Sequence, residues 1–373
     1  MSVSALSAPV AWESEIDCSV LVPVLNEERY VHKALAAMQA QTYDGQLEFV
    51  FADGGSVDRT VEILKAKAEQ DPRIRVCANP GRSVTSGLNV ALRHARGRWV
   101  ARMDAHSEYP HDYISLGIRR LQEGGTRWVS GPQVPRGHGP VSSAVAVALG
   151  ERTGRAGSRK WGTANDADGS EFELDSGVFT GVWKRATLLE YGGWDERWVC
   201  NEDSEMAARF LERGERLVCL PAMAAWYSPR DSLRLLWLQY LRYGEYRART
   251  ARHHPASLRR SHLVAPALVL AVPAALVGPR PSRRLARIAL GFYALALGLE
   301  GSHSIAKGQP ITEAGLVPAV LATMHFAWGI GTLRGSARFG PPWQAILKAT
   351  LGRPGLATDA VVAGPVFSPS LSD

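Results

Sequence analysis

The sequence contains few cysteines, and their spacing excludes two kinds of site. Cys18, Cys77, Cys200 and Cys219 are scattered along the 373 residues, and no two of them form a Cys-x-x-Cys pair. This pattern argues against a disulfide framework and against a structural zinc site, and it suits a reducing compartment. Residues 1–15 contain acids and have no basic start followed by an apolar run, so we expect no secretory signal.

The glycine pattern of a dinucleotide-binding site is missing as well. No Gly-x-Gly-x-x-Gly run follows a strand-like segment, and the first such segment continues into PVLNEE instead. A Rossmann dinucleotide site is therefore disfavoured. The second strand-like segment ends in DGGSVD, residues 53–58, whose two acids repel phosphate unless a cation intervenes. A nucleotide diphosphate that is bridged to these acids by a divalent ion would bind at such a site without repulsion.

Up to about Val129 the sequence alternates between strand and helix patterns. We expect strands at 18–24, 47–53, 73–78 and 98–105 and helices at 28–41, 56–70 and 83–95, with Ser56 as the N-cap of the second helix. Strands separated by such helices form a parallel sheet that is covered on both faces. The predicted fold class is therefore α/β with a mostly parallel sheet. Ligands of such sheets collect at the carboxyl ends of the strands, where Asp53 and Asp104 lie.

The middle of the chain is less regular. Residues 131–169 are rich in Gly, Pro and Arg, and we expect two mobile loops around a short helix at 141–150. Regular structure returns at 175–196, followed by a helix that begins with the acids at Glu202 and is closed by Gly214. No internal repeat is visible.

The C-terminal third has the pattern of membrane-associated helices. Residues 233–250 predict an amphipathic helix, and apolar segments follow at 263–278, 288–299 and 315–333. A bilayer span needs about 20 apolar residues, so only the third segment is adequate. By the positive-inside rule, the last two segments form a hairpin with residues 301–310 outside, and the first is re-entrant or interfacial. Three core helices of a soluble domain are the alternative, but the arginines that flank the segments argue against it.

The net charge of +7 raises the question of nucleic acid as a partner. Arginines dominate from Arg230 to Arg287, where they lie beside apolar segments rather than inside a recognisable nucleic-acid module. We therefore expect a negatively charged membrane surface as the partner and no nucleic acid.

The stretch RMDAHSEYP places a carboxylate and an imidazole two residues apart where a strand ends. A simple turn is one interpretation, because Asp and Pro both favour strand ends. A metal site is another, because Asp104 and His106 can reach one ion if the backbone turns. A metal-dependent hydrolase that uses Asp104, His106 and His111 is a third, but no further ligand cluster accompanies them.

Several motifs, taken in order, resemble the family 2 glycosyltransferases with a GT-A fold. They are VLVPVLNEERYV, ADGGSVDRT, RWVARMDAHSEYP, GGWDE, NEDSEMAARF and QYLRY, and they cover roughly Cys18 to Thr250. Each motif is weak alone, whereas six in this order are strong. The DAH and YP pairs, together with SPRDSLRLLWLQYLRYGEYRART, look most like the branch associated with succinoglycan-type exopolysaccharide synthesis.

The resemblance implies roles for residues on the donor side. Pro23, Glu27 and Asp53 match positions that hold the donor's nucleoside, and Asp58 matches the second acid of that motif. Asp104 and His106 fall on the Asp-x-Asp motif, which binds the donor and the divalent metal, Mn²⁺ or Mg²⁺. Histidine replaces the second acid here and removes a negative charge, which favours Mn²⁺ over Mg²⁺.

Further residues match the catalytic and acceptor positions. Asp203 matches the base that takes the proton from the attacking hydroxyl, and its neighbour Glu202 is placed on the acceptor side. Acids that satisfy a helix N-terminus are the alternative for this pair. Gln239, Arg242 and Tyr243 resemble the QxxRW motif, with the arginine and glutamine near the diphosphate and the tyrosine near the acceptor; an interfacial helix is the alternative. Trp183 and Trp194 could line the acceptor site or belong to the core.

The resemblance implies an inverting glycosyltransferase that moves one sugar from a nucleotide diphosphate sugar to a lipid-linked saccharide or glycolipid. UDP-glucose is the first candidate donor, and the expected location is the cytoplasmic face of the cell membrane. A processive polysaccharide synthase and a non-catalytic membrane scaffold stay open as alternatives. The expected domains are a tail (1–16), a catalytic domain (17–230, with donor half 17–130 and acceptor half 131–230), an interface helix (231–262), membrane-associated helices (263–335) and a second tail (336–373).

Overall fold

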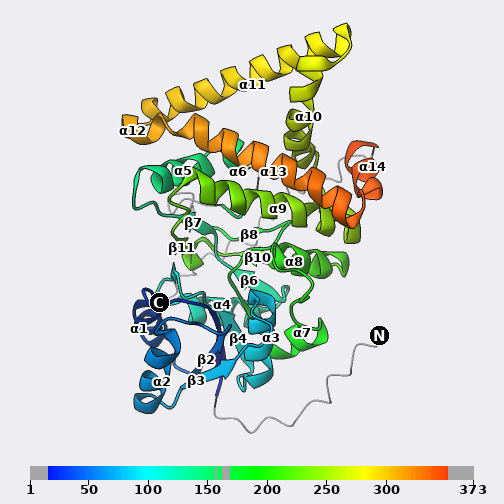
Figure 1. Ribbon diagram of the computed structural model, residues 1–373. Coiled ribbons are helices and arrows are strands. Elements are labelled where there is room, and N and C mark those ends of the chain that lie inside the picture. The colour runs from blue at the N-terminus through cyan, green and yellow to red at the C-terminus, as the bar shows by residue number, and fades with distance from the viewer. Residues whose placement is uncertain (1–15, 156–157, 162–168, 352–373) are drawn as a thin grey trace, which may run out of the picture.

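The computed structural model describes residues 16–155, 158–161 and 169–351. A mixed sheet carries helices on both faces, and a group of C-terminal helices lies on one side of this unit (Figure 1). Some predictions fall outside the described residues: nearly all of the tail at 1–16, the tail beyond Leu351, and parts of the loop at 150–169.

The main sheet has eight strands in the order β3-β2-β1-β4-β9-β6-β10-β8. Strands β1 to β4 are parallel, whereas β9 is antiparallel to both of its neighbours and β8 is antiparallel to β10. The α/β class is confirmed, with a sheet that is mixed rather than wholly parallel. The strands are β1 Cys18–Val24, β2 Leu47–Asp53, β3 Ile74–Ala78, β4 Trp99–Arg102, β6 Trp128–Ser130, β8 Phe172–Glu173, β9 Gly181–Lys184 and β10 Leu217–Cys219.

Alternate side chains of the central strands pack on opposite faces of the sheet. Val20 and Val22 of β1 join a core with side chains of α1, α2 and α4, whereas Leu21 joins a core with side chains of α3, α7 and α8. The parallel register brings the carboxyl ends of the strands to one edge, with Val24 opposite Asp53. These helices are α1 Val31–Gln39, α2 Thr60–Gln70, α3 Val84–His94, α4 Tyr113–Glu123, α7 Arg185–Glu190 and α8 Glu202–Glu212.

Two helix starts differ in how well the sequence predicted them. Helix α2 begins at Thr60, so Ser56 is not its N-cap. The Ser56 hydroxyl instead donates to Asp53 Oδ1 at 2.5 Å, which keeps the preceding loop folded onto the strand end. In contrast, Ser83 caps α3 and accepts from the Ser86 backbone N–H at 3.1 Å.

A second, three-stranded sheet forms from segments that the sequence analysis did not predict as strands. It has the order β5-β11-β7, with β5 Ser107–Glu108, β7 Gln133–Pro135 and β11 Ala225–Tyr227. The prediction of a mobile loop at 131–139 is therefore wrong in part, because β7 is fixed by parallel pairing with β11. The short helix expected at 141–150 is confirmed as α5 Pro140–Gly150, and α6 Arg152–Arg155 follows it.

The C-terminal helices form a layer beyond the main unit. In Figure 1, α9 lies between the sheet and α13, and α11 lies farthest from the sheet. The predicted amphipathic helix is confirmed as α9, whereas the tail expected from 336 is helical up to Leu351, apart from a short break before α14. The elements are α9 Leu233–His253, α10 Val264–Val277, α11 Arg280–Ala306, α12 Ile311–Ala314, α13 Val317–Phe339 and α14 Trp343–Leu351, with short 3-10 helices η1 Pro221–Met223, η2 Pro255–Ser257 and η3 Arg260–Leu263.

Helices α9 and α13 pack closely because glycines lie at their contacts. A Cβ atom on Gly244 would lie 2.0 Å from the Trp328 carbonyl oxygen, and one on Gly331 would lie 2.1 Å from the Leu241 carbonyl oxygen. Larger side chains at these positions would therefore push the two backbones apart. An ion pair of 2.6 Å between Arg338, near the end of α13, and Glu245, in the middle of α9, also joins the two helices.

Three helical segments are long and apolar enough to cross a membrane by length and composition: Arg260–Val277, Arg280–Ala306 and Ile311–Phe339. The second is longer than the sequence pattern predicted. The first two are mainly exposed, and large apolar side chains form much of their surface. The exposed ones are Val264, Leu270, Val272, Leu276, Val277, Leu285, Ile288, Phe292, Leu295, Leu299 and Ile305.

Residues 301–310, which the sequence predicts to lie outside in a membrane hairpin, lie beside the end of α5, and their side of the membrane stays a prediction. Lys307 forms an ion pair of 2.8 Å with Glu151, directly after α5. The first half of α13 buries Val317 and Val320 in a shared core with Ala148 of α5. This part of α13 therefore packs against α5, and we expect residues 301–310 to lie on the same side of a membrane as α5.

This arrangement predicts the labelling pattern of two introduced cysteines. In sealed vesicles, a membrane-impermeant maleimide should label Ala306→Cys and Val57→Cys from the same side of the membrane. Val57 is 88% exposed next to α2, and Ala306 is exposed at the end of α11. The partly exposed Cys77 and Cys200 are first replaced by serine. Labelling of the two introduced cysteines from opposite sides would contradict the arrangement.

Candidate active site

A cavity of about 1410 Å³ lies between the strand ends, α8, α9 and the C-terminal helices. It collects most of the residues that the sequence predicted for the site. They are Asp104, His106, Glu202, Asp203, Gln239, Arg242 and Tyr243. Residues from β4, from the start of α8 and from α9 thus come together although they are far apart in the sequence.

A buried arginine organises the strand end. The Arg102 guanidinium donates to both carboxylate oxygens of Asp104, at 2.9 and 3.0 Å, and lies 3.3 Å from Glu202 Oε1. Burial disfavours the charged guanidinium, but Asp104 and Glu202 outweigh it and raise the pKa of Arg102. The Asp104 backbone N–H donates to the Tyr109 hydroxyl at 2.7 Å, which fixes the turn after the strand. Arg102 therefore connects the two halves of the site.

The structure brings Asp104 and His106 together with Glu27. His106 Nδ1 lies 3.3 Å from Glu27 Oε1. This contact raises the pKa of His106. Among the described residues, no group of three or more His, Cys, Asp or Glu could hold a metal by itself. Asp104 and His106 alone could bind an ion that takes its other ligands from a bound diphosphate, as Mg²⁺ sites commonly do. They do not support the hydrolase interpretation with His111.

The two acids at the start of α8 face different partners. Glu202 contacts Arg102, whereas Asp203 Oδ2 lies 3.7 Å from Lys160 Nζ. Burial raises the pKa of Glu202, although Arg102 acts in the opposite direction. Asn201, just before the helix, has a left-handed backbone with φ of 57°, and its side chain donates to the Tyr243 carbonyl at 2.9 Å. Strained residues of this kind are often found at functional sites.

Hydrogen bonds join the loop after β1 to the loop after β2. The Glu27 backbone N–H donates to Thr60 Oγ1 at 2.8 Å, and the Glu28 backbone N–H donates to Asp58 Oδ2 at 3.1 Å. Thr60 also donates to Asp58, and this hydrogen bond lowers the pKa of Asp58. Asp58 is thus a brace between the loops, and its contact with a donor stays a prediction. The same holds for Pro23 and Glu27, which lie on β1 and the loop after it.

Asp53 folds its own loop around its carboxylate. It accepts from the Gly55 backbone N–H at 2.9 Å and from the Ser56 hydroxyl at 2.5 Å. It is buried at the carboxyl end of β2. Its predicted contact with a nucleoside stays a prediction.

Helix α9 supplies the polar side of the cavity. Gln239 donates to the Tyr243 hydroxyl at 3.0 Å, and Arg242 lines the cavity beside them. The two tryptophans considered for the acceptor site lie elsewhere. Trp183 and Trp194 are buried in the core, where their rings lie 5.9 Å apart and Trp183 also packs on Trp128. The prediction that Trp183 lines the acceptor site is therefore wrong.

Four basic residues that the sequence reading missed belong to this region: Arg102, Lys160, Arg247 and Arg259. Arg102 and Asp104 are two residues apart at a strand end, a spacing that places both side chains on one face. A single arginine in an otherwise apolar strand was the signal that could have revealed it. The other three come from a loop, from α9 and from the segment between η2 and η3, and no local pattern connects them.

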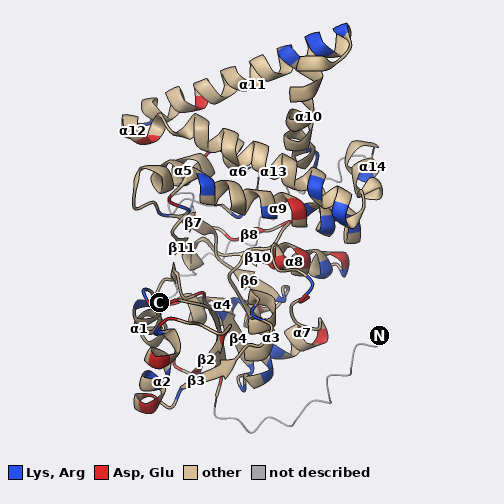
Figure 2. Cartoon of the chain, viewed as in Figure 1, with Lys and Arg blue, Asp and Glu red and all other residues tan. Residues whose placement is uncertain are grey.

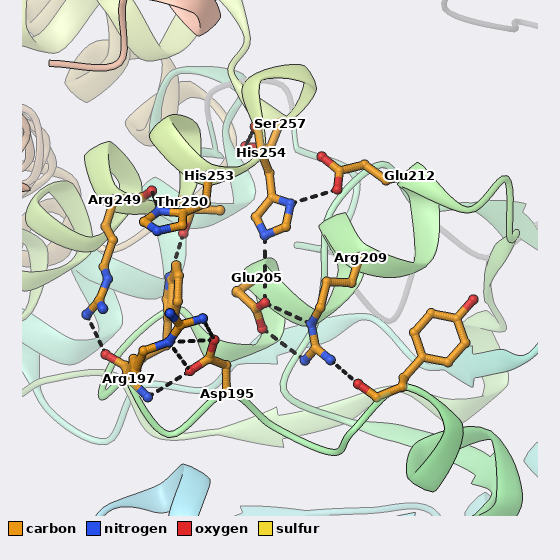
Figure 3. A network of polar contacts seen from close by, with 12 residues as sticks. Asp195, Arg197, Glu205, Arg209, Glu212, Arg249, Thr250, His253, His254 and Ser257 are labelled. Atoms are coloured by element: carbon orange, nitrogen blue, oxygen red, sulfur yellow. Dashed lines mark hydrogen bonds and ion pairs between the residues drawn. The ribbon is translucent and has the colours of Figure 1, made fainter. Parts of the chain in front are cut away.

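A polar network joins α8 to the end of α9 (Figure 3). His254 Nδ1 lies 2.8 Å from Glu212, and Nε2 lies 3.7 Å from Glu205. Glu205 also forms an ion pair of 2.8 Å with Arg209. Burial favours a neutral imidazole, but the hydrogen bonds to both glutamates outweigh it and raise the pKa of His254.

The raised pKa predicts how the His254 contribution to stability depends on pH. A group with a raised folded-state pKa stabilises the fold fully below its unfolded pKa, about 6.5 for histidine, and loses this effect as pH rises through the folded pKa. The difference in unfolding free energy between the wild type and His254→Gln should therefore be largest below this value and shrink at higher pH. Denaturant unfolding over this range measures it. A difference that grows with pH would contradict a charged His254.

Comparisons with known proteins agree with the geometry of the site. Residues 19–168 match the family model described as Glycosyl transferase family 2. The succinoglycan biosynthesis protein ExoA of Rhizobium meliloti (strain 1021) is 27% identical over 322 residues, covering 84% of this chain and 93% of the relative. A Methanococcus voltae protein, dolichyl N-acetyl-alpha-D-glucosaminyl phosphate 3-beta-D-2,3-diacetamido-2,3-dideoxy-beta-D-glucuronosyltransferase, is 22% identical over 233 residues, covering 61% of this chain and 71% of the relative.

A solved structure shows the same architecture. The mannosyltransferase PcManGT of Pyrobaculum calidifontis, in complex with GDP-Man and Mn²⁺, aligns with a TM-score of 0.55 and 21% identity over 87% of this chain and 90% of that chain. This similarity confirms the predicted GT-A fold. Residues 19–168 are thus a glycosyl transferase family 2 domain, and the chain is a glycosyltransferase.

Proposed function

We propose that the chain is an inverting glycosyltransferase that transfers one sugar from a nucleotide diphosphate sugar to a lipid-linked acceptor at a membrane surface. The observation that carries this proposal is that one cavity joins Asp104, His106 and Asp203 to apolar side chains of α10, α11 and α13. A sugar donor and an acceptor with a hydrocarbon chain can meet in such a space.

Residues at the strand ends would hold the donor. Arg102 fixes the Asp104 carboxylate, and Glu27 orients His106, so both side chains are positioned before a ligand arrives. A divalent ion bound by Asp104 and His106, Mn²⁺ or Mg²⁺, would neutralise charge on the leaving diphosphate. Gln239 and Arg242 would face the diphosphate from α9, where an arginine can form charge-assisted hydrogen bonds to phosphate oxygens.

Asp203 would act as the base. Its carboxylate would accept the proton of the acceptor hydroxyl as the hydroxyl attacks the anomeric carbon, and the bond to the diphosphate breaks on the opposite side of the ring. One displacement of this kind inverts the configuration. Glu202, the neighbouring acid, is held by Arg102 and would contact the acceptor rather than attack the sugar.

The donor sugar and the acceptor class are proposed from relatives. UDP-glucose is the first candidate through the resemblance to the succinoglycan branch. A relative is named as acting on a dolichyl-linked sugar phosphate, and the aligned mannosyltransferase was solved with GDP-Man and Mn²⁺. The first is consistent with a lipid-linked saccharide as acceptor, and the second with a divalent ion.

The exposed apolar side chains of α10 and α11 would attach the chain to the membrane. Exposed apolar patches of this extent mark membrane or protein contacts. Basic residues lie at the start of α11, which Figure 2 shows in blue next to α10. They are Arg280, Arg283, Arg284 and Arg287. Such residues suit the anionic cytoplasmic leaflet. The catalytic domain would therefore face the cytoplasm.

A transfer assay tests this function. Purified full-length chain in detergent is incubated with radiolabelled UDP-glucose, Mn²⁺ and a lipid extract of the cells that contain the chain. We expect label to pass into the organic phase, and the anomeric configuration of the product to be opposite to that of the donor. Label that enters no lipid from UDP-glucose or from any other nucleotide sugar would contradict the proposal and favour the scaffold alternative.

A further inference from the structure

Three basic side chains, those of Lys160, Arg247 and Arg259, line the cavity near Asp203. Lys160 Nζ lies 3.7 Å from Asp203 Oδ2, and Arg247 Nη2 donates to Ser204 Oγ at 3.3 Å. Arg259 pairs with Asp175, an acid whose side chain is 67% exposed. All three basic residues line the cavity. Because Glu202 faces Arg102 while Asp203 faces Lys160, the start of α8 separates this group from the expected donor site.

The positive charge of this group is incompletely balanced within the described part of the chain. Arg247 has no carboxylate within 4.0 Å among residues 16–155, 158–161 and 169–351. Burial lowers the pKa of Arg247 to about 10, and Arg259 acts in the same direction. Burial also lowers the pKa of Lys160, although Asp203 opposes it. Buried charges of one sign are costly unless an opposite charge joins them, so the cavity is suited to an anion here.

The cavity continues from these basic residues into an apolar space. Its walls there are Leu268 of α10, Ala296 and Leu297 of α11, and Met324 and Trp328 of α13. These helices are the segments that are apolar enough to enter a membrane. Figure 1 shows them on the side of α9 that faces away from the sheet. An occupant of the whole cavity would therefore be anionic near Asp203 and hydrocarbon-like beyond it.

We infer that Lys160, Arg247 and Arg259 bind the phosphate or diphosphate of a lipid-linked acceptor, whose hydrocarbon chain lies between α10, α11 and α13. This inference rests on the proposed function and assigns the acceptor's anionic group to named residues. The acceptor hydroxyl then lies on the sugar side of the phosphate, next to Asp203. A glycolipid without a phosphate would leave Arg247 without an anionic partner among the described residues.

Direct binding of small probes tests the inference. Full-length chain in detergent is titrated calorimetrically with farnesyl diphosphate, with farnesol, which lacks the phosphates, and with inorganic diphosphate, which lacks the chain. We expect farnesyl diphosphate to bind, and Arg247→Gln and Arg259→Gln to weaken this binding by about 10- to 100-fold each, the loss of one charge-assisted hydrogen bond. Arg247→Lys should restore part of the affinity, which shows that the site is folded.

A matched control removes an arginine elsewhere. Arg284→Gln, at the exposed start of α11, changes the net charge equally and should leave the affinity for farnesyl diphosphate unchanged. Equal binding of farnesyl diphosphate by wild type, Arg247→Gln and Arg259→Gln would overturn the inference. Inorganic diphosphate binding as tightly as farnesyl diphosphate would also overturn it, because the site would then bind a free anion and not a lipid.

Failure of the inference can be told apart from failure of the proposed function. If the chain transfers sugar to a lipid but both arginine variants keep the wild-type KM for that acceptor, the inference fails and the function stands. If farnesyl diphosphate binds in an Arg247-dependent manner but no nucleotide sugar is used, the lipid site stands and the function fails. When both hold, the variants raise the KM for the acceptor and leave the KM for the donor unchanged.

Discussion

Replacing Asp203 by asparagine should lower the rate of sugar transfer by about 10²- to 10⁴-fold, the usual contribution of a general base. The amide keeps the size of the side chain but cannot take a proton from the acceptor hydroxyl. Asp203 lines the cavity next to Lys160, on the side that we propose for the acceptor. Binding of the nucleotide, measured by calorimetry with the same preparation, should therefore be unchanged.

The neighbouring acid provides the control for this result. Glu202→Gln leaves Arg102 paired with Asp104, so we expect a higher KM for the acceptor and a smaller fall in kcat than for Asp203→Asn. A larger fall in kcat for Glu202→Gln would transfer the role of base to Glu202. Wild-type rates for Asp203→Asn would remove the role of base from Asp203.

Replacing Arg102 by methionine should destabilise the fold by about 3–5 kcal/mol, the usual cost of removing one partner from a buried ion pair. The Arg102 side chain is 4% exposed, and its loss leaves two carboxylates, Asp104 and Glu202, without a positive partner. Denaturant unfolding in detergent measures the change. Arg102→Lys should recover only part of the stability, because an ammonium cannot reproduce the planar two-point contact with Asp104.

A similar pair on the surface makes a matched control. Arg73 also contacts both oxygens of an aspartate two residues away, Asp71, but its side chain is 41% exposed. We expect Arg73→Met to cost about 0–1 kcal/mol, as exposed pairs usually do. Equal destabilisation by the two substitutions would show that the burial of Arg102 is not what makes its pairs important.

The sequence predicted the donor half of the fold well because each strand and helix there is determined by its own short sequence pattern. Each apolar run between Cys18 and Ala78 has the length of one strand and is followed by one helix, and a fourth strand ends at Arg102. The strand ends could therefore be assigned without knowledge of pairing, and Asp53 and Asp104 were placed at the correct edge of the sheet. The same logic missed the second sheet, because the two-residue β5 gains its order only from pairing with β11, more than a hundred residues away.

The acceptor half and the C-terminal helices depend on contacts that no short pattern contains. An apolar run such as 315–333 satisfies a bilayer and a protein core equally well, and here α5 and α9 provide the core for α13. Trp183 likewise has an aromatic ring of the kind that binds sugars, but this ring packs on Trp128 and Trp194. Lys160, Arg247 and Arg259 meet only after the chain has folded, so their grouping could not be read from spacing.

The measurement that tests the account most directly is calorimetric binding of UDP, GDP and their sugars to the full-length chain, with and without Mn²⁺, for wild type and Asp104→Ala. The account predicts that one nucleotide binds to the wild type, that binding requires the metal, and that Asp104→Ala abolishes it. Mn²⁺ alone should bind weakly, because Asp104 and His106 provide only two ligands. Folded wild-type protein that binds no nucleotide, with or without Mn²⁺, would contradict the account.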